Sequence, residues 1–136
     1  MPALKITKAS FSDDPAICLV AKQSPFTRDF TSHRFFRANI EADYAKGFVG
    51  VAKRGAVVAG FVYCKHLVRR PMSVIHYMGV ETSFRGEGVG RKLLDWALKT
   101  SPWPRIELSC EHRNEGAMAF YEKSGLAPLM AGAYGK

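Results

Sequence analysis

The chain has 136 residues, of which 47% are hydrophobic and 24% are charged, and its 20 Lys and Arg outnumber its 12 Asp and Glu by eight. This composition is typical of a globular domain and excludes a disordered tail, a collagen and a coiled coil. The length predicts a single domain over residues 1–136, whose core can form without a disulfide or a metal. The net charge of +8 favours a polyanionic partner, such as nucleic acid or a phosphorylated cofactor, without choosing between them.

The apolar stretches are too short for a membrane protein. The longest, residues 56–64, is less than half of the ~20 residues that a membrane-spanning helix needs. The N-terminal residues lack the basic and apolar regions of a secretory signal. Cys18, Cys64 and Cys110 are odd in number and far apart, which indicates reduced thiols rather than a disulfide framework. We therefore expect a cytoplasmic protein with no membrane partner.

Periodicity, turn residues and helix-capping residues predict the elements in chain order. The expected elements are strand 4–8, helix 12–23, helix 32–46, strands 48–53, 56–66 and 73–80, helix 89–100, strand 105–111, helix 114–124 and one strand in the remaining residues. This order predicts an α/β or α+β fold with a mixed sheet.

A glycine-rich loop precedes the amphipathic helix predicted over residues 89–100. Gly86, Gly88 and Gly90 follow a predicted strand, and glycines there allow a tight turn in which several backbone N–H groups point at one place. The N-terminus of the next helix adds a partial positive charge. Residues 85–90 are therefore predicted to bind phosphate, although glycines also make ordinary turns.

Two other nucleotide-binding motifs do not match this loop. A Walker loop requires Lys and then Ser or Thr after its last glycine, whereas Gly90 is followed by Arg91 and Lys92. A dinucleotide-binding fold places its glycine loop after the first strand of a βαβ unit, whereas here a predicted hairpin precedes the loop.

Two blocks of sequence resemble one family. Residues 80–94, VETSFRGEGVGRKLL, are similar to the acyl-CoA pyrophosphate loop of the GNAT superfamily of N-acetyltransferases, whose pattern is Arg/Gln-x-x-Gly-x-Gly/Ala at the start of a helix. Residues 114–126, NEGAMAFYEKSGL, are similar to the downstream segment of that family. The resemblance implies a mixed, mostly antiparallel sheet that is splayed between its two middle strands and flanked by about four helices. It also implies direct transfer of an acetyl group from acetyl-CoA to a primary amine in a ternary complex.

The C-terminal segment departs from the family pattern. Members of the family usually end in two further strands paired as a hairpin, whereas residues 126–136 can form one strand and a stub. Either the fold is shortened here, or a second chain completes the sheet, because a long unpaired edge is an aggregation hazard. We therefore expect a homodimer.

The resemblance also implies where acetyl-CoA binds, between the splayed strands. The backbone of Met78 and Val80 would pair with the pantetheine arm, and residues 85–91 would wrap around the pyrophosphate. Asn114 would cap its helix and contact the cofactor or an ordered water. The implied cofactor-binding residues are Met78, Val80, Arg85, Gly86, Glu87, Gly88, Val89, Gly90, Arg91, Asn114 and Tyr121.

Acetyl transfer to an amine requires a neutral nucleophile and a stabilised CoA thiolate. Tyr121 is similar to the tyrosine that protonates or hydrogen-bonds the sulfur in this family. His76 is a candidate base because its ordinary pKa of ~6.5 suits proton removal near neutrality, although a core histidine is an equally good interpretation. Glu81 and Glu111 are alternatives, and a chain of waters is another.

The alternatives include zinc and non-catalytic functions. Cys64 with His66 and Cys110 with His112 suggest zinc ligands, but structural zinc sites take paired ligands from tight turns, so no metal is expected. A non-catalytic module of the same fold would bind nucleic acid through its basic surface, in a salt-dependent manner. Acetylation of an amine on a nucleotide or nucleic acid is compatible with the charge but not required by it.

Overall fold

A computed structural model describes residues 2–25, 27, 47–67, 71–109, 115–130 and 133–135. The expected helix 32–46 and Asn114 lie outside these ranges. The strands are β1 (Leu4–Lys8), β2 (Gly47–Arg54), β3 (Val57–Leu67), β4 (Met72–Val80), β5 (Ile106–Ser109), β6 (Ala127–Met130) and β7 (Ala133–Gly135). The α-helices are α1 (Asp14–Ala21), α3 (Val89–Thr100) and α4 (Glu115–Lys123), and two 3₁₀ turns are η1 (Phe11–Asp13) and η3 (Thr82–Phe84).

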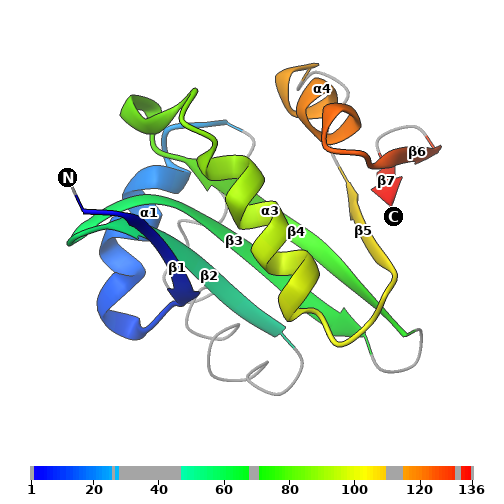
Figure 1. The fold of residues 1–136 in the computed structure, drawn as a ribbon, viewed down its shortest axis with the longest axis horizontal. Coiled ribbons are helices and arrows are strands. Elements are labelled where there is room, and N and C mark those ends of the chain that lie inside the picture. The colour runs from blue at the N-terminus through cyan, green and yellow to red at the C-terminus, as the bar shows by residue number, and fades with distance from the viewer. Residues whose placement is uncertain are drawn as a thin grey trace.

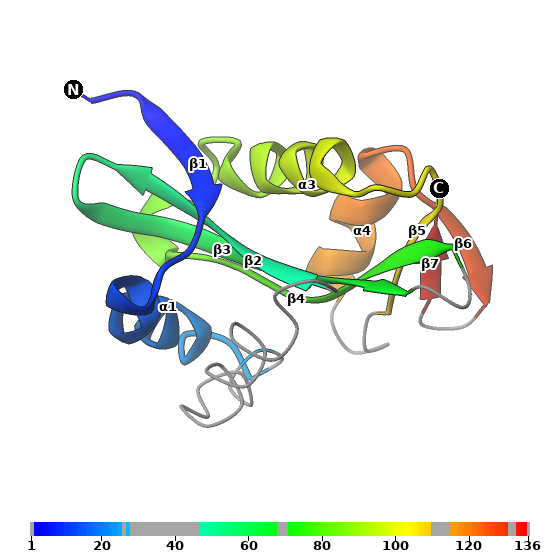
Figure 2. The ribbon, with the colours of Figure 1, turned by 90° about the horizontal axis from the view of Figure 1, so that it is seen from below.

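The strands form one seven-stranded sheet in the order β1-β2-β3-β4-β5-β7-β6 (Figure 1). Neighbouring strands are antiparallel except β4 and β5, which are parallel. Helix α1 lies on one face of the sheet and α3 on the other (Figure 2). The mixed, mostly antiparallel sheet confirms the fold class that the sequence predicted.

The two faces bury separate apolar clusters, which explains the composition of β3. One cluster lies under α1 and contains Ile17 and Phe61, and the other lies under α3 and contains Val62 and Leu93. Successive side chains of a strand point to opposite faces, so the run of buried residues 58–64 reflects cover on both sides.

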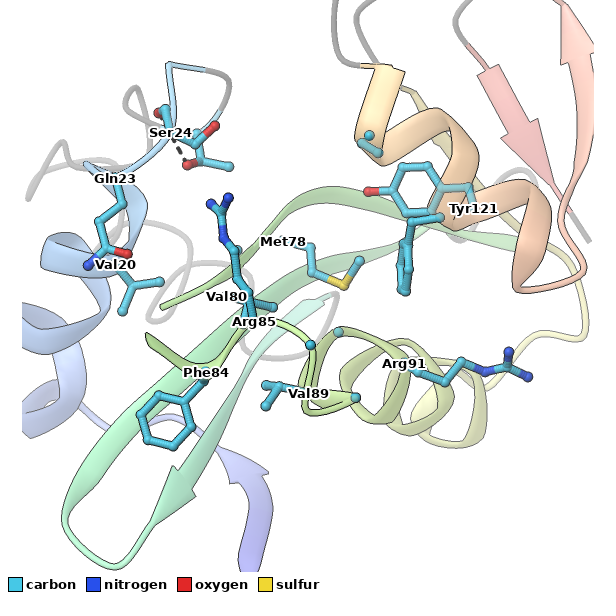
Figure 3. Close-up of a pocket in the computed structure, with 18 of the residues that line it drawn as sticks. Val20, Gln23, Ser24, Met78, Val80, Phe84, Arg85, Val89, Arg91 and Tyr121 are labelled. Carbon is cyan, nitrogen blue, oxygen red and sulfur yellow. Dashed lines mark hydrogen bonds between the residues drawn. The ribbon is translucent and has the colours of Figure 1, made fainter. Parts of the chain in front are cut away.

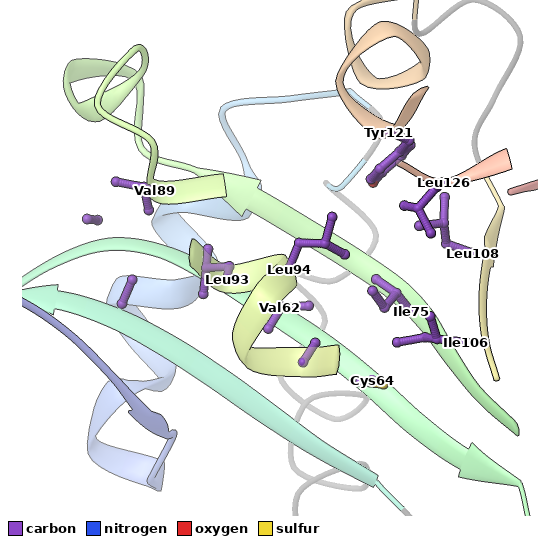
Figure 4. Packing of buried hydrophobic residues seen from close by; sticks show 13 residues of the cluster. Val62, Cys64, Ile75, Val89, Leu93, Leu94, Ile106, Leu108, Tyr121 and Leu126 are labelled. Carbon is purple, nitrogen blue, oxygen red and sulfur yellow. The ribbon is translucent and has the colours of Figure 1, made fainter. Parts of the chain in front are cut away.

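Helix α3 packs on the sheet through one apolar stripe. Val89, Leu93, Leu94 and Ala97 are its buried residues, and their spacing places them on one side of a helix. Figure 4 shows the side chains of α3 beside those of the strands and Tyr121 of α4. This packing fixes the N-terminus of α3 above the end of β4.

The parallel pairing of β4 with β5 is short. It joins Ser73, Val74 and Ile75 to residues 106–108, and among the described residues it ends there, whereas β4 continues to Val80. A bulge falls at the same point, because Tyr63 pairs with Tyr77 and Cys64 with Ile75, so that His76 is the extra residue. Since a bulge bends its strand and increases the local twist, it directs the rest of β4 away from β5 and produces the expected splay.

The C-terminal segment contains two strands where the sequence predicted one strand and a stub. Strand β7 pairs with both β5 and β6, so it lies inside the sheet and β6 forms the edge. Both strands are short, of three and four residues. None of the helices in the described ranges is long and apolar enough to cross a membrane.

Candidate active site

A cavity of about 890 Å³ opens at the splay (Figure 3). This volume is in the range of small-molecule and cofactor sites. The end of α1, the end of β4, the glycine loop, the first turn of α3 and the helix α4 all contribute to its wall. The lining residues are Val20, Gln23, Ser24, Pro25, Thr27, Met78, Gly79, Val80, Phe84, Arg85, Gly86, Gly88, Val89, Gly90, Arg91, Gly116, Ala117, Phe120, Tyr121, Lys123 and Ser124.

The glycine loop adopts a conformation that requires glycine at two positions. Gly86 has φ +85° and Gly88 has φ +80°, in the left-handed region that other residues rarely adopt. A side chain at either position would meet no atom within 4 Å, so the backbone angle and not crowding selects glycine. Gly88 is the N-cap of α3, and its carbonyl accepts the N–H of Lys92 at 3.1 Å.

The first turn of α3 forms part of the wall of the cavity. An α-helix leaves the N–H groups of its first turn without intrahelical acceptors, and Val89, Gly90 and Arg91 occupy that turn and line the cavity. The partial positive charge of the helix terminus lies at the same place. This arrangement suits an anion such as a diphosphate.

The charged residues that line the cavity are cations. Arg85, Arg91 and Lys123 are among the lining residues, and no Asp or Glu occurs among the described ones. In Figure 3, the guanidinium of Arg85 points across the cavity towards the end of α1, and that of Arg91 points outward along α3. Arg91 Nε lies 3.3 Å from Asp95 Oδ1, one turn further along the helix. The cavity therefore favours an anionic ligand.

Helix α4 supplies Tyr121 to the opposite wall. The residue is only 8% exposed and belongs to the cluster under α3, and its ring meets that of Phe120 edge-on, with the centroids 5.4 Å apart. The hydroxyl points towards the cavity (Figure 3). Packing therefore fixes the ring while its polar end remains at the site.

Glu81 does not line the cavity. Its carboxylate accepts a hydrogen bond from the side chain of Ser83, one from the backbone N–H of Ser83 at 2.8 Å, and one from Gln23 Nε2 at 3.2 Å. The hydrogen bond from the Ser83 side chain, with these others, holds the pKa of Glu81 below its ordinary value, against a smaller opposing effect of burial. A lowered pKa makes this carboxylate a weaker base.

His76 and Glu87 are also absent from the described lining of the cavity. The His76 ring is exposed and stacks on Tyr63, with the centroids 5.5 Å apart, and Tyr63 belongs to the cluster under α1. The Glu87 carboxylate lies 2.9 Å from Arg54 Nη1. The other predicted residues of the site line the cavity, except Asn114, which lies outside the described ranges together with the alternative base Glu111.

The cysteines that the structure describes are poor nucleophiles. Burial raises the pKa of the Cys64 thiol to about 12. Burial, together with the neighbouring Asp14, raises that of Cys18 to about 11. Cys110 and His112 lie outside the described ranges, and within those ranges no three His, Cys, Asp or Glu side chains are placed to hold a metal ion.

The sequence did not predict the contribution of α1. Gln23 lines the cavity, and its side-chain oxygen accepts hydrogen bonds from the backbone N–H and the hydroxyl of Thr82, at 2.9 and 2.8 Å. These residues are 59 positions apart, and no local motif signals such a contact. Lys123 also lines the cavity, and the sequence did not predict it as a site residue.

Comparisons with known proteins agree with this geometry. Residues 12–126 match the model of the acetyltransferase (GNAT) family. The chain is 35% identical over 120 residues to the 5-NmdU N-acetyltransferase of Pseudomonas phage PaMx11, covering 88% of this chain and 84% of the relative. It is 34% identical over 77 residues to the mycothiol acetyltransferase of Jonesia denitrificans, covering 54% of this chain and 24% of that protein.

The fold has close counterparts among solved structures. An acetyltransferase of the GNAT family from Staphylococcus aureus Mu50 superposes with a TM-score of 0.77 at 20% identity, over 98% of each chain. The family model and the named relatives support an acetyl-transferring enzyme over a non-catalytic module. The chain belongs to the acetyltransferase (GNAT) family.

Proposed function

We propose that this enzyme transfers an acetyl group from acetyl-CoA to an amine by direct attack in a ternary complex. The observation that carries the proposal is the cavity at the splay. Among the described residues that line it are the first turn of α3, Arg85 and Lys123, and none of them is Asp or Glu. Such a wall suits the diphosphate of CoA.

The proposed position of the coenzyme follows from the elements around the cavity. The diphosphate would lie against residues 85–91, and Arg85 would reach it from the loop. The pantetheine arm would lie along β4 from Met78 to Val80, where the described pairing with β5 has ended. The thioester would then approach Tyr121 of α4.

Tyr121 is proposed to act as the acid. The amine nitrogen attacks the thioester carbonyl carbon, the carbon–sulfur bond breaks, and the departing thiolate takes a proton or a hydrogen bond from the Tyr121 hydroxyl. A proton positioned in this way typically contributes ~10²–10⁴ in rate. The direction of the hydroxyl supports this role.

For the base, the arrangement favours loss of the amine proton to water. No described lining residue is Asp, Glu or His. The Glu81 carboxylate is engaged by Ser83 and Gln23, and His76 stacks on Tyr63 outside the cavity lining. A His76→Ala variant with unchanged turnover and pH profile supports the water route, whereas lower turnover with loss of the acidic limb of the profile, where a base becomes protonated, assigns the role to His76.

For the acceptor, we propose an amine carried by a nucleotide. The relative from phage PaMx11 is named for N-acetylation of 5-NmdU, and the alignment covers most of both chains. The net charge of +8 suits a phosphorylated acceptor. The decisive experiment is an acceptor screen that measures release of CoA with a thiol reagent, using free aminonucleosides, their phosphates, amine-bearing DNA and simple polyamines.

Binding of the coenzyme is tested separately. Acetyl-CoA at a hundred times its Kd would stabilise the folded state by ~2.7 kcal/mol, so the melting temperature should rise by several degrees. An unchanged melting temperature at millimolar acetyl-CoA would contradict the proposed function.

A further inference from the structure

The glycine loop is attached to the β2–β3 hairpin by Arg54. Arg54 Nη1 lies 2.9 Å from Glu87 Oε1, and Glu87 lies between Gly86 and Gly88, two loop residues with positive φ. The Glu87 side chain is 41% exposed and is absent from the described lining of the cavity. The carboxylate therefore belongs to the back of the loop, while the backbone on either side of it faces the site.

The guanidinium of Arg54 is itself held in place. Arg54 is the last residue of β2 and pairs with Leu4 and Val57 in the sheet. Its guanidinium carbon lies 5.4 Å from the centroid of the Phe84 ring, within the range of a cation–π interaction. Figure 3 shows the Phe84 ring directed towards the β2–β3 hairpin. Arg54 thus contacts the loop at Phe84 and at Glu87, on both sides of Arg85.

The guanidinium of Arg54 is partly removed from water by its position. Its Nε is buried and has no hydrogen-bond partner within the described part of the chain, and its side chain is only 23% exposed. The arginine side of the ion pair is thus partly shielded from water, while the Glu87 carboxylate remains exposed, so the pair itself contributes modestly.

Two physical effects would follow from releasing this contact. Gly86 and Gly88 are permissive hinges, so Glu87 and the adjoining N–H groups would become mobile, and a ligand that needs them in one arrangement would bind more weakly. The freed Glu87 carboxylate would also add an unpaired negative charge next to a diphosphate, which repels it.

We infer that Arg54 and Glu87 are positioning residues that hold the glycine loop in its diphosphate-binding conformation and neutralise the one carboxylate within it. The inference rests on the proposed function, because it assigns the ligand of the loop as the diphosphate of acetyl-CoA. Neither side chain needs to touch the ligand.

The test measures binding of CoA, which needs no knowledge of the acceptor. Isothermal titration compares the wild type with Arg54→Met, Glu87→Gln and the double variant, after circular dichroism has confirmed their fold. Glu87→Gln should weaken CoA binding about threefold, because it removes only the ion pair. Arg54→Met should weaken it about tenfold, because it removes the ion pair and also leaves the Glu87 charge unpaired. The double variant should resemble Glu87→Gln, because the repulsive charge is then gone and the effects of contacting residues are not additive.

Two controls identify the cause of a lower CoA affinity in these variants. Arg105→Met removes an arginine from a similar exposed pair with Glu107 on β5, outside the described lining of the cavity, and should leave the Kd for CoA unchanged. ADP contains the diphosphate without the pantetheine arm. Its affinity should fall in Arg54→Met by the same factor as the affinity for CoA. A loss for CoA with none for ADP would overturn the inference.

The outcomes separate this inference from the proposed function. If the wild type does not bind CoA, the proposed function fails and the inference with it. If the wild type binds CoA and folded Arg54→Met binds it equally well, only the inference fails. Should Arg54→Met not fold, Glu87→Gln, at an exposed loop position, decides in the same way: an unchanged Kd overturns the inference and a threefold loss supports it.

Discussion

The hydroxyl of Tyr121 is the proposed acid for the departing thiolate, so its removal should affect turnover more than binding. Tyr121→Phe keeps the buried ring and its edge-on contact with Phe120. We expect kcat to fall by ~10²-fold while the KM for acetyl-CoA changes little, as measured by CoA release in steady state. Tyr77→Phe, a matched change of a tyrosine that does not line the cavity, should leave kcat unchanged. If kcat falls equally in both variants, Tyr121 does not act as the acid.

Asp13 should control the stability of the fold in acid. Burial alone would raise the pKa of its carboxyl, but the hydrogen bond from Lys53, the backbone N–H of Ser10 and the charge of Lys53 together lower it. Lys53 Nζ lies 2.5 Å from Asp13 Oδ1. Because the pKa is lower in the folded state, the stabilisation is present above the unfolded pKa and is lost as the pH falls through the folded pKa.

Asp13→Asn should therefore lower the free energy of unfolding by about 1 kcal/mol at pH 7. The difference from the wild type should shrink below about pH 4, as followed by urea denaturation across pH. Glu107→Gln, in the exposed pair with Arg105, is the control and should change little. A difference that stays constant down to the acid limit would show that the charge of Asp13 is not involved.

Some site residues could not be predicted because their roles depend on distant contacts. Gly86, Gly88 and Tyr121 are in local motifs, and they line the cavity as the sequence predicted. Gln23 reaches the site only because α1 packs on the sheet beside the end of β4. Glu87 was predicted to bind the cofactor from its place in the loop, and only the structure reveals that its side chain pairs with Arg54.

At the scale of elements, the conformation of the glycine loop should be sensitive to any side chain at its hinges. Gly88→Ala would place a Cβ at φ +80°, a conformation that costs about 1–2 kcal/mol for an L residue. Space is available around it, so we expect the loop to relax rather than the core to unfold. CoA affinity should fall about tenfold, measured by isothermal titration.

Gly125→Ala is the matched control for this loop. Gly125 has φ +89° and open space around its Cβ position, and it does not line the cavity. The same strain should therefore lower the melting temperature without changing CoA affinity. If both variants bind CoA like the wild type, the left-handed conformation of Gly88 is unnecessary for the site.

Elements with strong local patterns were predictable from the sequence. The alternation and β-branched residues of β2, β3 and β4 and the apolar stripe of α3 indicate them directly. The bulge at His76 was not predictable, because it depends on the register between β3 and β4. The place of β7 between β5 and β6 was also missed, because three residues carry too little pattern to define a strand.

At the scale of the whole molecule, the association state stays a prediction. The expectation of a homodimer depended on a long unpaired edge, whereas the edges of the sheet are β1 and β6, with five and four residues. Short edge strands are one of the ways in which proteins avoid edge pairing. The argument for a homodimer from an unpaired edge is therefore weakened. Light scattering at micromolar concentrations measures the mass directly. A mass of twice 15.1 kDa would support the dimer, and a monomer across that range would end the expectation.

The three-residue junction between β4 and β5 also affects how the chain folds and opens. Strands β2 to β4 form from neighbouring segments, whereas β5 can join them only after the chain has passed through α3, which is a non-local and slower step. In the described ranges, backbone pairing joins strands β5 to β7 to the rest of the sheet only through this narrow seam, while Ile106 and Leu108 also pack in the cluster under α3. Since the proposed coenzyme site begins where this seam ends, we expect the departure of spent CoA to be coupled to a transient widening between β4 and the C-terminal strands.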